Sequence, residues 1–455
     1  MKATILIAML LSTSICATAA DYTTPGDGSE YDFEKLSTIS GSGVEKSESI
    51  YVINGTCTIA TGDRFKIDSG ATIEFDTDGE LVIQGTADLQ SESPTILRRH
   101  GTATGCIGIS LQSSAVTEVS NLLFDYVGLR GQGTAGMNVS HCTFSNHSGT
   151  VSSALFTGGD GATFVIRDCT FDHCQKAAIG GAANYLCPVS IQDCVFKKNS
   201  QANNNIPQLN LTGAETITIK NCIVEGDSTL NRVGGIAIAN WFGTEGVNVN
   251  IEGCTIIDNR YGITTTGVMD IVIKGNTIVN NKFEANPYLG GSGINLSDSS
   301  YKLNAVITGN RIERNLWGVT IIGCGDVNLG KTEIDAGSTD YNPGNNVFKD
   351  NGNGGTPYDL YNNSTNTVYA QGNYWSVPVQ DAENIETVIF HKNDYSSLGE
   401  VIYLPAGNTV GIHSARLEKH APKGIYRVDG SRVSEATLPT LPHGIYIIDG
   451  KKTVR

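Results

Sequence analysis

A short phrase recurs through the middle of this chain, and its repetition restricts the possible folds more than any other feature. Each copy has an apolar residue, a polar residue, a turn former, Cys or Asn, any residue, and then a bulky apolar residue. Examples are V-S-H-C-T-F from Val139, I-R-D-C-T-F from Ile166, I-E-G-C-T-I from Ile251 and I-T-G-N-R-I from Ile307. A unit that returns every few tens of residues is typical of a solenoid, in which each unit buries its apolar face only against its neighbours.

The repeated units have the pattern of strands. Apolar and polar residues alternate with period two, and Ile, Val, Thr and Phe are frequent, while Asn, Asp and Gly interrupt every unit before a helix could form. The framework of leucine-rich repeats is absent. A further strand pattern follows most units, at Ile179, Ile236, Ile263, Ile294 and Val319. We therefore predict an all-β fold, a parallel β-helix with three strands and three bends in each coil.

Stacked coils turn equivalent positions into columns of side chains, because successive coils lie roughly 4.8 Å apart. The Cys or Asn position of the phrase predicts one inward ladder, formed by Leu122, Cys142, Cys169, Cys194, Cys222, Cys254, Asn276, Asn310, Asn346 and Asn373. Two positions later we expect an inward apolar stack of Phe124, Phe144, Phe171, Phe196, Val224, Ile256, Ile278, Ile312, Phe348 and Trp375. The residue before the ladder is in nearly every copy one that tolerates φ > 0, so the chain is expected to bend there. Five positions after the ladder, side chains are expected to bond from coil to coil: His147, Cys174, Asn199, Asp227, Asn259, Asn281, Asn315 and Asn351.

The chain has eleven cysteines, a number that in an exported protein usually indicates disulfides. Five of them belong to the predicted ladder, where side chains stacked in parallel are too far apart and too alike in direction for good disulfide geometry. A column also cannot converge on one metal ion, so we predict a ladder of buried thiols and no metal site. Cys174 and Cys187 both lie in predicted bends, and the sequence leaves open whether this pair forms a disulfide.

Residues 1–20 have the pattern of a secretory signal peptide. Lys2 precedes an apolar stretch from Ala3 to Cys16, and the segment ends in A-T-A-A. Ile15 stands where a lipoprotein signal requires a small residue, so we interpret Cys16 as part of the apolar stretch. No other segment is apolar over the length that a membrane-spanning helix needs. We expect a mature chain without a transmembrane segment, secreted or held at the outer-membrane cell surface.

The repeats resemble those of right-handed parallel β-helix proteins of the pectin-lyase-like superfamily, from about Lys46 to Ser376. The segments Y-V-I-N-G-T-C-T-I-A and E-L-V-I-Q-G-T-A are similar to the opening coils of such proteins from Bacteroidota. The resemblance implies a right-handed solenoid, which we assign to residues 46–400, after an N-terminal segment at 21–45. A shared fold does not by itself imply an activity.

The end of the chain repeats a different phrase, G-I-Y-R-V-D-G from Gly424 and G-I-Y-I-I-D-G from Gly444. Asp-Gly after an alternating strand indicates a hairpin, so residues 401–455 are predicted to form a small antiparallel β module. The ending G-I-Y-x-x-x-G-K-K-x resembles the C-terminal sorting domain of the type IX secretion system of Bacteroidota. The resemblance implies export across the outer membrane, with the secretion machinery as a partner. The alternative is a hairpin that caps the solenoid.

The sequence contains no complete catalytic motif of the enzymes that share this fold. The polygalacturonase set of N-T-D, D-D, G-H-G and R-I-K is absent, and so is the W-x-D-H signature of pectate lyases. The candidates that remain stand on a predicted outward stripe two positions before the ladder, where Lys220, Glu252 and Lys274 would be neighbours on adjacent coils. A lyase could use such a group, and only in that case would a cofactor, Ca²⁺, be expected. The alternative is an exposed ladder of ion pairs.

Sugar binding without catalysis requires only exposed aromatic faces flanked by polar side chains. The longest coils carry Trp241, Phe242, Tyr288 and Tyr341, which we predict as ligand-binding residues because inserted loops on a rigid scaffold usually carry function. Three further rings, those of Tyr261, Phe283 and Trp317, share the position seven residues after the ladder. These rings form either part of the core or an outward aromatic stripe.

Charge narrows the class of ligand. The 31 basic and 46 acidic residues leave a net charge of −15, which repels polyanions, so we do not expect nucleic acid as a partner. The function that we expect is that of a surface or secreted β-helix that binds a glycan, host or matrix material through its longer coils, without catalysis. The alternative is a polysaccharide lyase or glycoside hydrolase that acts on an outward strand face.

Overall fold

The computed structural model describes residues 21–159, 161–181, 187–212, 215–240, 247–284, 289–298, 300 and 302–407, and four short strands between residues 425 and 454. The chain divides into two compact units, Met1–Gly407 and Asn408–Arg455. Predicted signal residues 1–20 lie outside the described residues. In the described part of the chain, no helix has the length and apolar character needed to cross a bilayer.

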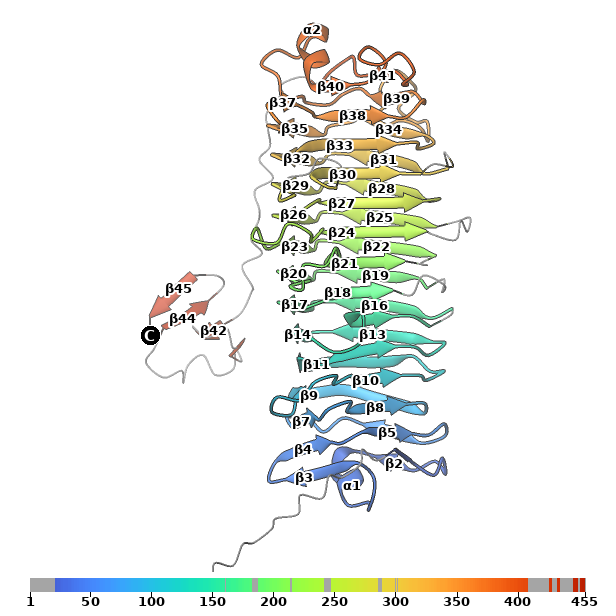
Figure 1. The fold of residues 1–455 in the computed structure, drawn as a ribbon, viewed down its shortest axis with the longest axis vertical. Coiled ribbons are helices and arrows are strands. Elements are labelled where there is room, and N and C mark those ends of the chain that lie inside the picture. The colour runs from blue at the N-terminus through green and yellow to red at the C-terminus, as the bar shows by residue number, and fades with distance from the viewer. Residues whose placement is uncertain are drawn as a thin grey trace, which may run out of the picture. The chain divides into compact units, whose positions relative to one another are not determined.

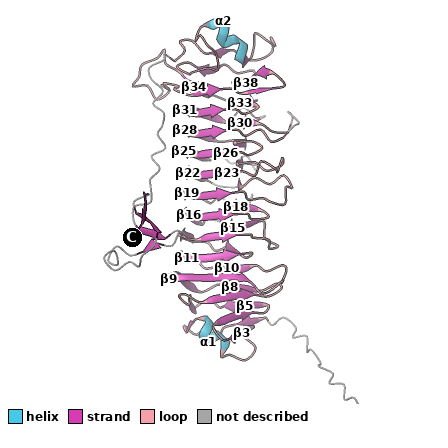
Figure 2. Ribbon diagram, turned by 90° about the vertical axis from the view of Figure 1, so that its left-hand side faces the viewer, coloured by secondary structure: helices cyan, strands magenta, loops and turns pink. Residues whose placement is uncertain are grey.

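The first unit is a parallel β-helix, in which the chain winds upward one coil at a time (Figures 1 and 2). A representative coil contains β25 (Asn248–Glu252), a bend at Gly253, the short strand β26 (Thr255–Ile257) and, after a longer turn, β27 (Ile263–Gly267). Each of these strands pairs in parallel with the equivalent strand of the next coil. The paired strands form three parallel sheets, which we call sheets 1, 2 and 3.

Sheet 1 is continuous from the first coil to the last, and its strands are β1 (Tyr22–Thr23), β5 (Thr56–Ile59), β8 (Glu80–Ile83), β10 (Gly108–Leu111), β12 (Gly128–Gly131), β15 (Ser153–Thr157), β18 (Ala177–Gly181), β21 (Leu209–Thr212), β24 (Ile236–Asn240), β27, β30 (Ser292–Ser297), β33 (Trp317–Ile322), β38 (Leu360–Asn363) and β40 (Ile389–Phe390). Sheet 2 contains β2 (Glu30–Tyr31), β6 (Arg64–Lys66), β9 (Thr86–Arg99), β11 (Thr117–Asp125), β13 (Gly136–Ser140), β16 (Thr163–Arg167), β19 (Val189–Gln192), β22 (Thr216–Lys220), β25, β28 (Asp270–Lys274), β31 (Asn304–Thr308), β34 (Val327–Gly330), β39 (Val368–Ala370) and β41 (Val401–Ile402). Sheet 3 contains β4 (Ile50–Ile53), β7 (Thr72–Phe75), the second halves of β9 and β11, β14 (Thr143–Ser145), β17 (Thr170–Asp172), β20 (Val195–Lys197), β23 (Ile223–Glu225), β26, β29 (Thr277–Val279), β32 (Arg311–Glu313) and β35 (Val347–Lys349).

The first and last coils carry short additional elements. At the start, β3 (Val44–Ser47) pairs antiparallel with β4, and helix α1 (Phe33–Ser37) begins where Asp32 accepts a hydrogen bond from the Lys35 N–H. At the end are the hairpin β36 (Gly352–Asn353) with β37 (Thr356–Pro357), helix α2 (Ala382–Ile385) and the 3₁₀ turn η1 (Glu386–Val388). Because β1 and β2 already pair with β5 and β6, the sheets begin earlier than the predicted boundary at residue 46.

The second unit contains a four-stranded antiparallel sheet in the order β43 (Arg432–Val433), β42 (Ile425–Arg427), β44 (Ile445–Ile448) and β45 (Lys451–Val454). Strands β42 and β44 carry the two copies of the G-I-Y phrase. The predicted pairing of these alternating segments into a small antiparallel module agrees with this sheet.

The bend between sheets 2 and 3 has the backbone conformation that its residues favour. The residue before the ladder has positive φ in ten successive copies, at Asn121, His141, Asp168, Asp193, Asn221, Gly253, Gly275, Gly309, Asn345 and Gly372. Asn, Asp and Gly occupy this left-handed region at little cost. The bend reverses the direction of the next side chain, so the ladder residue returns to the interior.

Aromatic rings stack face to face inside the solenoid. The ring centroids of Phe124 and Phe144 lie 4.5 Å apart at an interplanar angle of 2°, and Phe144 and Phe171 are 4.7 Å apart at 3°. Phe196 continues the stack at 5.0 Å from Phe171. These distances match the strand spacing of roughly 4.8 Å, which shows that the coils themselves impose the stacking. Each such ring is fully buried and stabilises the fold by roughly 1.5–3 kcal/mol.

The Cys and Asn ladder is inward and buried throughout. In its second half the amides bond directly from coil to coil: Asn310 Nδ2 donates to Asn346 Oδ1 at 2.9 Å, and Asn310 Oδ1 accepts from Asn276 Nδ2 at 3.0 Å. In its first half the thiols point to backbone carbonyls instead, as Cys169 Sγ does toward Arg167 O at 3.1 Å. Cys174 and Cys187 are both buried, and they do not form a disulfide with each other.

The second ladder differs from the predicted column at two coils. His147 is buried but has no hydrogen-bond partner at either ring nitrogen, so the predicted bond from coil to coil is absent there. Asn259, Asn281 and Asn315 bond in series, but Asp227 is only partly buried and bonds to Thr229 in its own turn. Gln208 occupies the interior in its place, accepting from Asn199 Nδ2 at 3.0 Å and donating to Asn259 Oδ1 at 2.9 Å. A neutral amide can both donate and accept, whereas a carboxylate in that position would be buried without a proton to donate.

Candidate functional site

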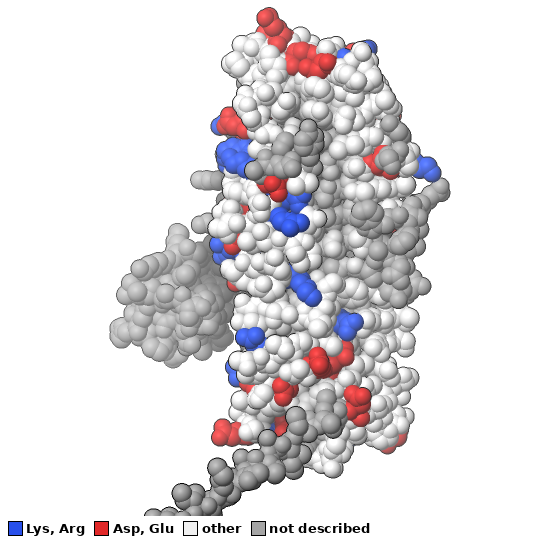
Figure 3. All heavy atoms as spheres, in the orientation of Figure 1, with Lys and Arg blue, Asp and Glu red and all other residues white. Residues whose placement is uncertain are grey.

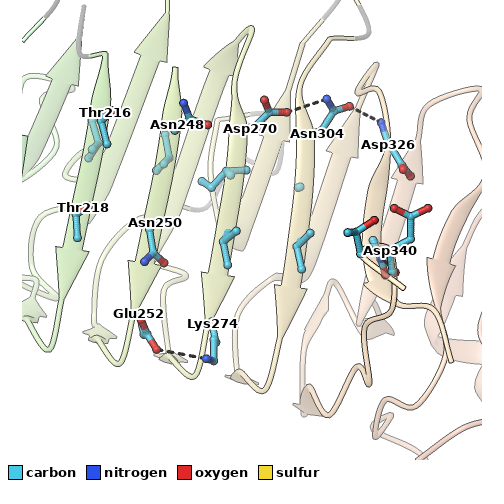
Figure 4. Close-up of a pocket in the computed structure, with 18 of the residues that line it drawn as sticks. Thr216, Thr218, Asn248, Asn250, Glu252, Asp270, Lys274, Asn304, Asp326 and Asp340 are labelled. Carbon is cyan, nitrogen blue, oxygen red and sulfur yellow. Dashed lines mark hydrogen bonds and ion pairs between the residues drawn. The ribbon is translucent and has the colours of Figure 1, made fainter. Parts of the chain in front are cut away.

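Two grooves open on different faces of the solenoid. The first lies on the outer face of sheet 2 and has a volume of about 690 Å³, and we call it the sheet 2 groove (Figure 4). Strands β22, β25, β28 and β31 form its floor, because side chains at alternate positions of each strand point outward. The segment from Thr339 to Tyr341 forms part of its wall.

The predicted outward stripe forms one edge of the sheet 2 groove. Lys220, Glu252 and Lys274 stand in register on β22, β25 and β28. Glu252 lies between the two lysines, with N···O distances of 3.4 Å to Lys220 and 3.5 Å to Lys274. The hydrogen bond from Lys220 is the main cause that lowers the pKa of Glu252 below its usual value. A carboxyl group in this environment stays ionised at neutral pH and is a poor general acid.

A row of polar side chains crosses the opposite edge of the floor. Asn304 Nδ2 donates to Asp270 Oδ1 at 2.9 Å, and the backbone N–H of Asp326 donates to Asn304 Oδ1 at 3.0 Å (Figure 4). Between this row and the stripe lie Val272 and Val306, paired in register and each 38% exposed. The wall is fixed to the floor by Asn328 Nδ2, which donates to the carbonyl of Asp340 at 2.9 Å.

The second groove lies on the outer face of sheet 1 and has a volume of about 750 Å³, and we call it the sheet 1 groove. Outward residues of β27, β30, β33 and β38 form the floor, in the register Thr264, Asn295, Thr320 and Tyr361. The ends of these strands add Ser292, Trp317, Ile322 and Asn363 to the lining, and the turns that precede the strands add Tyr261, Leu289, Gly290, Asn353, Gly354 and Tyr358.

Aromatic rings follow one another along the sheet 1 groove. The centroid of Trp317 lies 6.2 Å from that of Tyr358, and Tyr358 lies 5.8 Å from Tyr361 in an edge-to-face arrangement. Tyr361 stacks on Phe390 of the next coil at 4.5 Å and an interplanar angle of 4°. The rings therefore present a series of aromatic surfaces over neighbouring coils.

Amides and hydroxyl groups complete the sheet 1 groove. Asn295 Nδ2 donates to Thr264 Oγ1 at 2.9 Å, and the hydroxyl groups of Ser292 and Thr320 are 3.0 Å apart. Two aliphatic side chains beside them are exposed, Leu289 by 51% and Ile322 by 40%. Among the described residues that line this groove there is no Asp, Glu, Lys, Arg or His.

The turn that carries Leu289 is held from beneath by Arg260. The Arg260 guanidinium donates to the carbonyl of Leu289 and to Asn205 Oδ1, and lies against the ring of Tyr261. Burial raises the pKa of Tyr261 to about 12, so its hydroxyl stays protonated at neutral pH. Tyr261 can thus donate a hydrogen bond but cannot act as a base.

Of the four predicted ligand-binding residues, only Tyr341 is among the described residues. Trp241, Phe242 and Tyr288 lie outside the described residues. Tyr341 lines the sheet 2 groove. Of the three rings that could be core or outward stripe, Tyr261 and Trp317 line the sheet 1 groove, whereas Phe283, which is partly buried, does not.

Sequence reasoning missed Tyr358, Tyr361 and Phe390. One signal could have found Tyr361, because it follows the inward residue Leu360 directly and must therefore point outward. The hairpin β36–β37 interrupts the repeat before β38, so this register was not visible from the hexapeptide alone.

The described residues offer no site for a metal ion that protein side chains alone would hold. No three of their His, Cys, Asp or Glu side chains converge as metal ligands would. The sheet 2 groove contains several carboxylates, but they are distributed over separate coils.

Comparisons with known proteins agree with the fold. The family described as "Right handed beta helix region" matches residues 90–245, and a family of unknown function, DUF1565, matches residues 180–381. Among solved structures, a mutant of the periplasmic alginate epimerase AlgG is similar over 82% of this chain and 84% of its own, with 12% identity and a TM-score of 0.40. The chain matches no curated protein. The predicted fold class is confirmed: the protein is a right-handed parallel β-helix with a small antiparallel module.

Proposed function

We propose that this protein is an exported carbohydrate-binding β-helix that holds an uncharged glycan in the sheet 1 groove without cleaving it. The observation that carries this proposal is the series of rings of Trp317, Tyr358 and Tyr361 beside amides and hydroxyl groups in one groove. Sugar rings have apolar faces that pack on aromatic side chains and hydroxyl groups that bond to amides. A neutral lining suits a neutral glycan better than a uronate polymer, which would require cations.

The same groove offers no group for acid or base catalysis among its described residues. Cleavage of a glycosidic bond by hydrolysis uses a pair of carboxyl groups, and a lyase needs a base beside an acidic proton. The described lining contributes only hydroxyl and amide groups, and the Tyr261 hydroxyl is protonated at neutral pH. For the alternative catalytic stripe, the lowered pKa of Glu252 favours the interpretation of Lys220, Glu252 and Lys274 as an ion-pair ladder.

Export is supported by the sequence at both ends of the chain. Residues 1–20 follow the signal peptide pattern, and the repeated G-I-Y phrase resembles the type IX sorting domain of Bacteroidota. We propose that the solenoid is secreted or held at the cell surface, with the secretion machinery as the partner of the C-terminal module. A surface protein meets polysaccharides of its surroundings, which agrees with the proposed ligand.

The proposal is tested by glycan retention. The mature protein is run through native gels that contain neutral or acidic polysaccharides, and affinity for retained glycans is measured by calorimetry. Trp317→Ala and Tyr361→Ala are expected to weaken binding about tenfold each, because each removes one stacking surface worth roughly 1 kcal/mol or more. Tyr341→Ala, in the sheet 2 groove, is the matched control and is expected to bind as the wild type does.

Two results would contradict the proposal. One is the absence of retention by every neutral polysaccharide, and the other is unchanged binding by Trp317→Ala and Tyr361→Ala. Incubation of the same glycans followed by assays for reducing or unsaturated ends addresses catalysis, and product formation would reject the non-catalytic function.

A further inference from the structure

The sheet 2 groove contains an apolar patch that the solenoid itself does not require. Val272 and Val306 are at outward positions, where β25 has Asn250 and β34 has Asn328. Each valine is 38% exposed, and the two lie in register on adjacent coils, so they form one continuous surface. A walled hollow with apolar side chains in its floor is the usual form of a binding site.

Two carboxylates beside this patch have no cation. Glu252 is paired with Lys220 and Lys274, and Asp340 lies 3.6 Å from Lys331. Asp270, in contrast, accepts only from the neutral amide of Asn304, and neither Asp270 nor Asp326 forms an ion pair with a described residue. Asp270, Asn304 and Asp326 stand in one row on successive coils, which places the two carboxylates roughly 10 Å apart.

We infer that the sheet 2 groove binds an extended basic peptide segment of another protein, with aliphatic side chains over Val272 and Val306 and Lys or Arg side chains at Asp270 and Asp326. An extended chain presents side chains on one face at roughly 7 Å intervals, so aliphatic and basic residues of one segment can reach the patch and the row together. This inference does not depend on the proposed function, because it concerns another sheet and another class of ligand.

The lining favours a peptide over an amino sugar polymer. Sugar rings pack on aromatic faces, and the sheet 2 groove has one aromatic residue in its described lining, Tyr341, which stands in the wall. Its exposed apolar residues are branched aliphatic side chains, which complement the aliphatic side chains of a peptide. The unpaired carboxylates select for a positive charge and against an acidic segment.

The inference is tested with a fluorescent synthetic peptide that repeats Lys-Ser-Val-Ser, which we call the lysine–valine peptide, because its lysine and valine side chains lie on the same face of an extended chain. Its binding to the full-length mature protein is measured by anisotropy at low and at high salt. We expect saturable binding that weakens about tenfold in the double variant Asp270→Asn with Asp326→Asn, and that weakens with added salt. Asp350→Asn, an exposed carboxylate on sheet 3 whose backbone has φ of 54°, is the matched control and is expected to bind normally.

Further probes separate the apolar and charged contributions. Val272→Thr with Val306→Thr keeps the β-branched shape but removes apolar surface, and it is expected to weaken the lysine–valine peptide severalfold while leaving a lysine–serine peptide unchanged. A peptide that repeats Glu-Ser-Val-Ser is expected not to bind. The inference is overturned if the lysine–valine peptide does not bind, if the Asp270→Asn and Asp326→Asn changes have no effect, or if a glucosamine oligomer binds more tightly than the peptide.

Discussion

At the scale of single residues, His147 is the side chain least suited to its position. It stands in the second ladder, where most other coils have amides, and it is fully buried with no hydrogen-bond partner at either ring nitrogen. Burial lowers its pKa from 6.5 to about 4, and the nearby charge of Lys176 acts in the same direction. The ring must therefore be neutral for the protein to fold, and protonation opposes folding.

The first residue-scale prediction concerns the pH dependence of His147. The pKa of His147 is lower in the folded state than in the unfolded state, so the folded protein binds fewer protons between pH 6.5 and pH 4. The contribution of neutral His147 to the free energy of unfolding is therefore fully present above pH 6.5 and is lost as the pH decreases. The loss from this group is expected to reach about 3 kcal/mol at pH 4. His147→Leu is expected to remove that part of the acid dependence, measured by urea unfolding at pH 7, 5.5 and 4.

The pH dependence of His147→Leu must be compared with that of the wild type, because a second buried group, Asp359, changes the stability with pH in the opposite direction. Burial raises its pKa from 3.8 to about 6, so its contribution to stability decreases as the pH rises through that interval. Asp359 is present in both proteins, and its effect cancels in the difference. If the free energies of unfolding of His147→Leu and wild type differ by the same amount at all three pH values, His147 does not titrate as described.

At the scale of elements, the ladders determine which coils can follow one another. Asn310 accepts bonds from the backbone N–H and the side chain of Asn276, and it donates to Ile273 O and to Asn346. Each coil thus satisfies buried polar groups of its neighbours, which would otherwise lie unpaired in the core. Strand pairing alone could slip by two residues without reversing the faces, but the ladder bonds exist in one register only.

We predict that removal of one ladder residue destabilises the solenoid locally and strongly. Asn310→Ala leaves the backbone N–H of Asn276 without its ladder partner and removes one bond to the carbonyl of Ile273, so the free energy of unfolding is expected to fall by about 2–4 kcal/mol. The measurement is chemical unfolding followed by circular dichroism. Asn204→Ala, an exposed loop residue, serves as control and is expected to change stability by less than about 0.5 kcal/mol.

If Asn310→Ala lowers the free energy of unfolding as little as the Asn204→Ala control does, the ladder amides stabilise the solenoid by little more than the volume that they fill. Hydrogen exchange offers a second readout, because coils that contact Asn310 are expected to lose protection more than coils near Phe124.

At the scale of the whole molecule, one stack of coils presents different chemistry on different sides. Sheet 1 carries the aromatic groove and sheet 2 the groove with unpaired carboxylates, while the interior between them is apolar. On the face seen in Figure 3 the charged side chains are scattered and do not form one large patch. The two grooves therefore differ by their local lining.

The interior also predicts the behaviour of the thiols. Ten described cysteines are buried and form no disulfide, and burial raises the pKa of Cys174 and of Cys57 to about 12. Thiols that are buried and protonated react slowly, so the native mature protein is expected to release almost no product with a thiol reagent, whereas the guanidinium-unfolded protein is expected to react at all ten sites. Peptide mass spectrometry that finds a linked Cys174–Cys187 pair would contradict this expectation.

Much of the solenoid could be predicted from the hexapeptide, because the interactions that form it join residues close in sequence or at equivalent positions of adjacent coils. Alternation of apolar and polar residues identifies strands, and a residue that tolerates positive φ before each Cys or Asn identifies the bend, as at Asp168 and Asn221. The inward Phe stack follows directly, since the coil spacing leaves each ring only its equivalent in the next coil as a neighbour. The place of Asp227 was predicted wrongly, because Gln208 from another turn reaches the same interior position.

The sequence by itself determined the repeat, the alternation of inward and outward side chains and the composition of the Cys and Asn ladder, because these depend on neighbours within one coil and on the equivalent position in the next. Only the tertiary structure decided where the grooves lie. Trp317, Tyr358 and Phe390 come from coils of unequal length, and turns such as that of Leu289 decide which outward residues stay exposed. The lengths and paths of such turns depend on packing between coils, which no pattern within the repeat records.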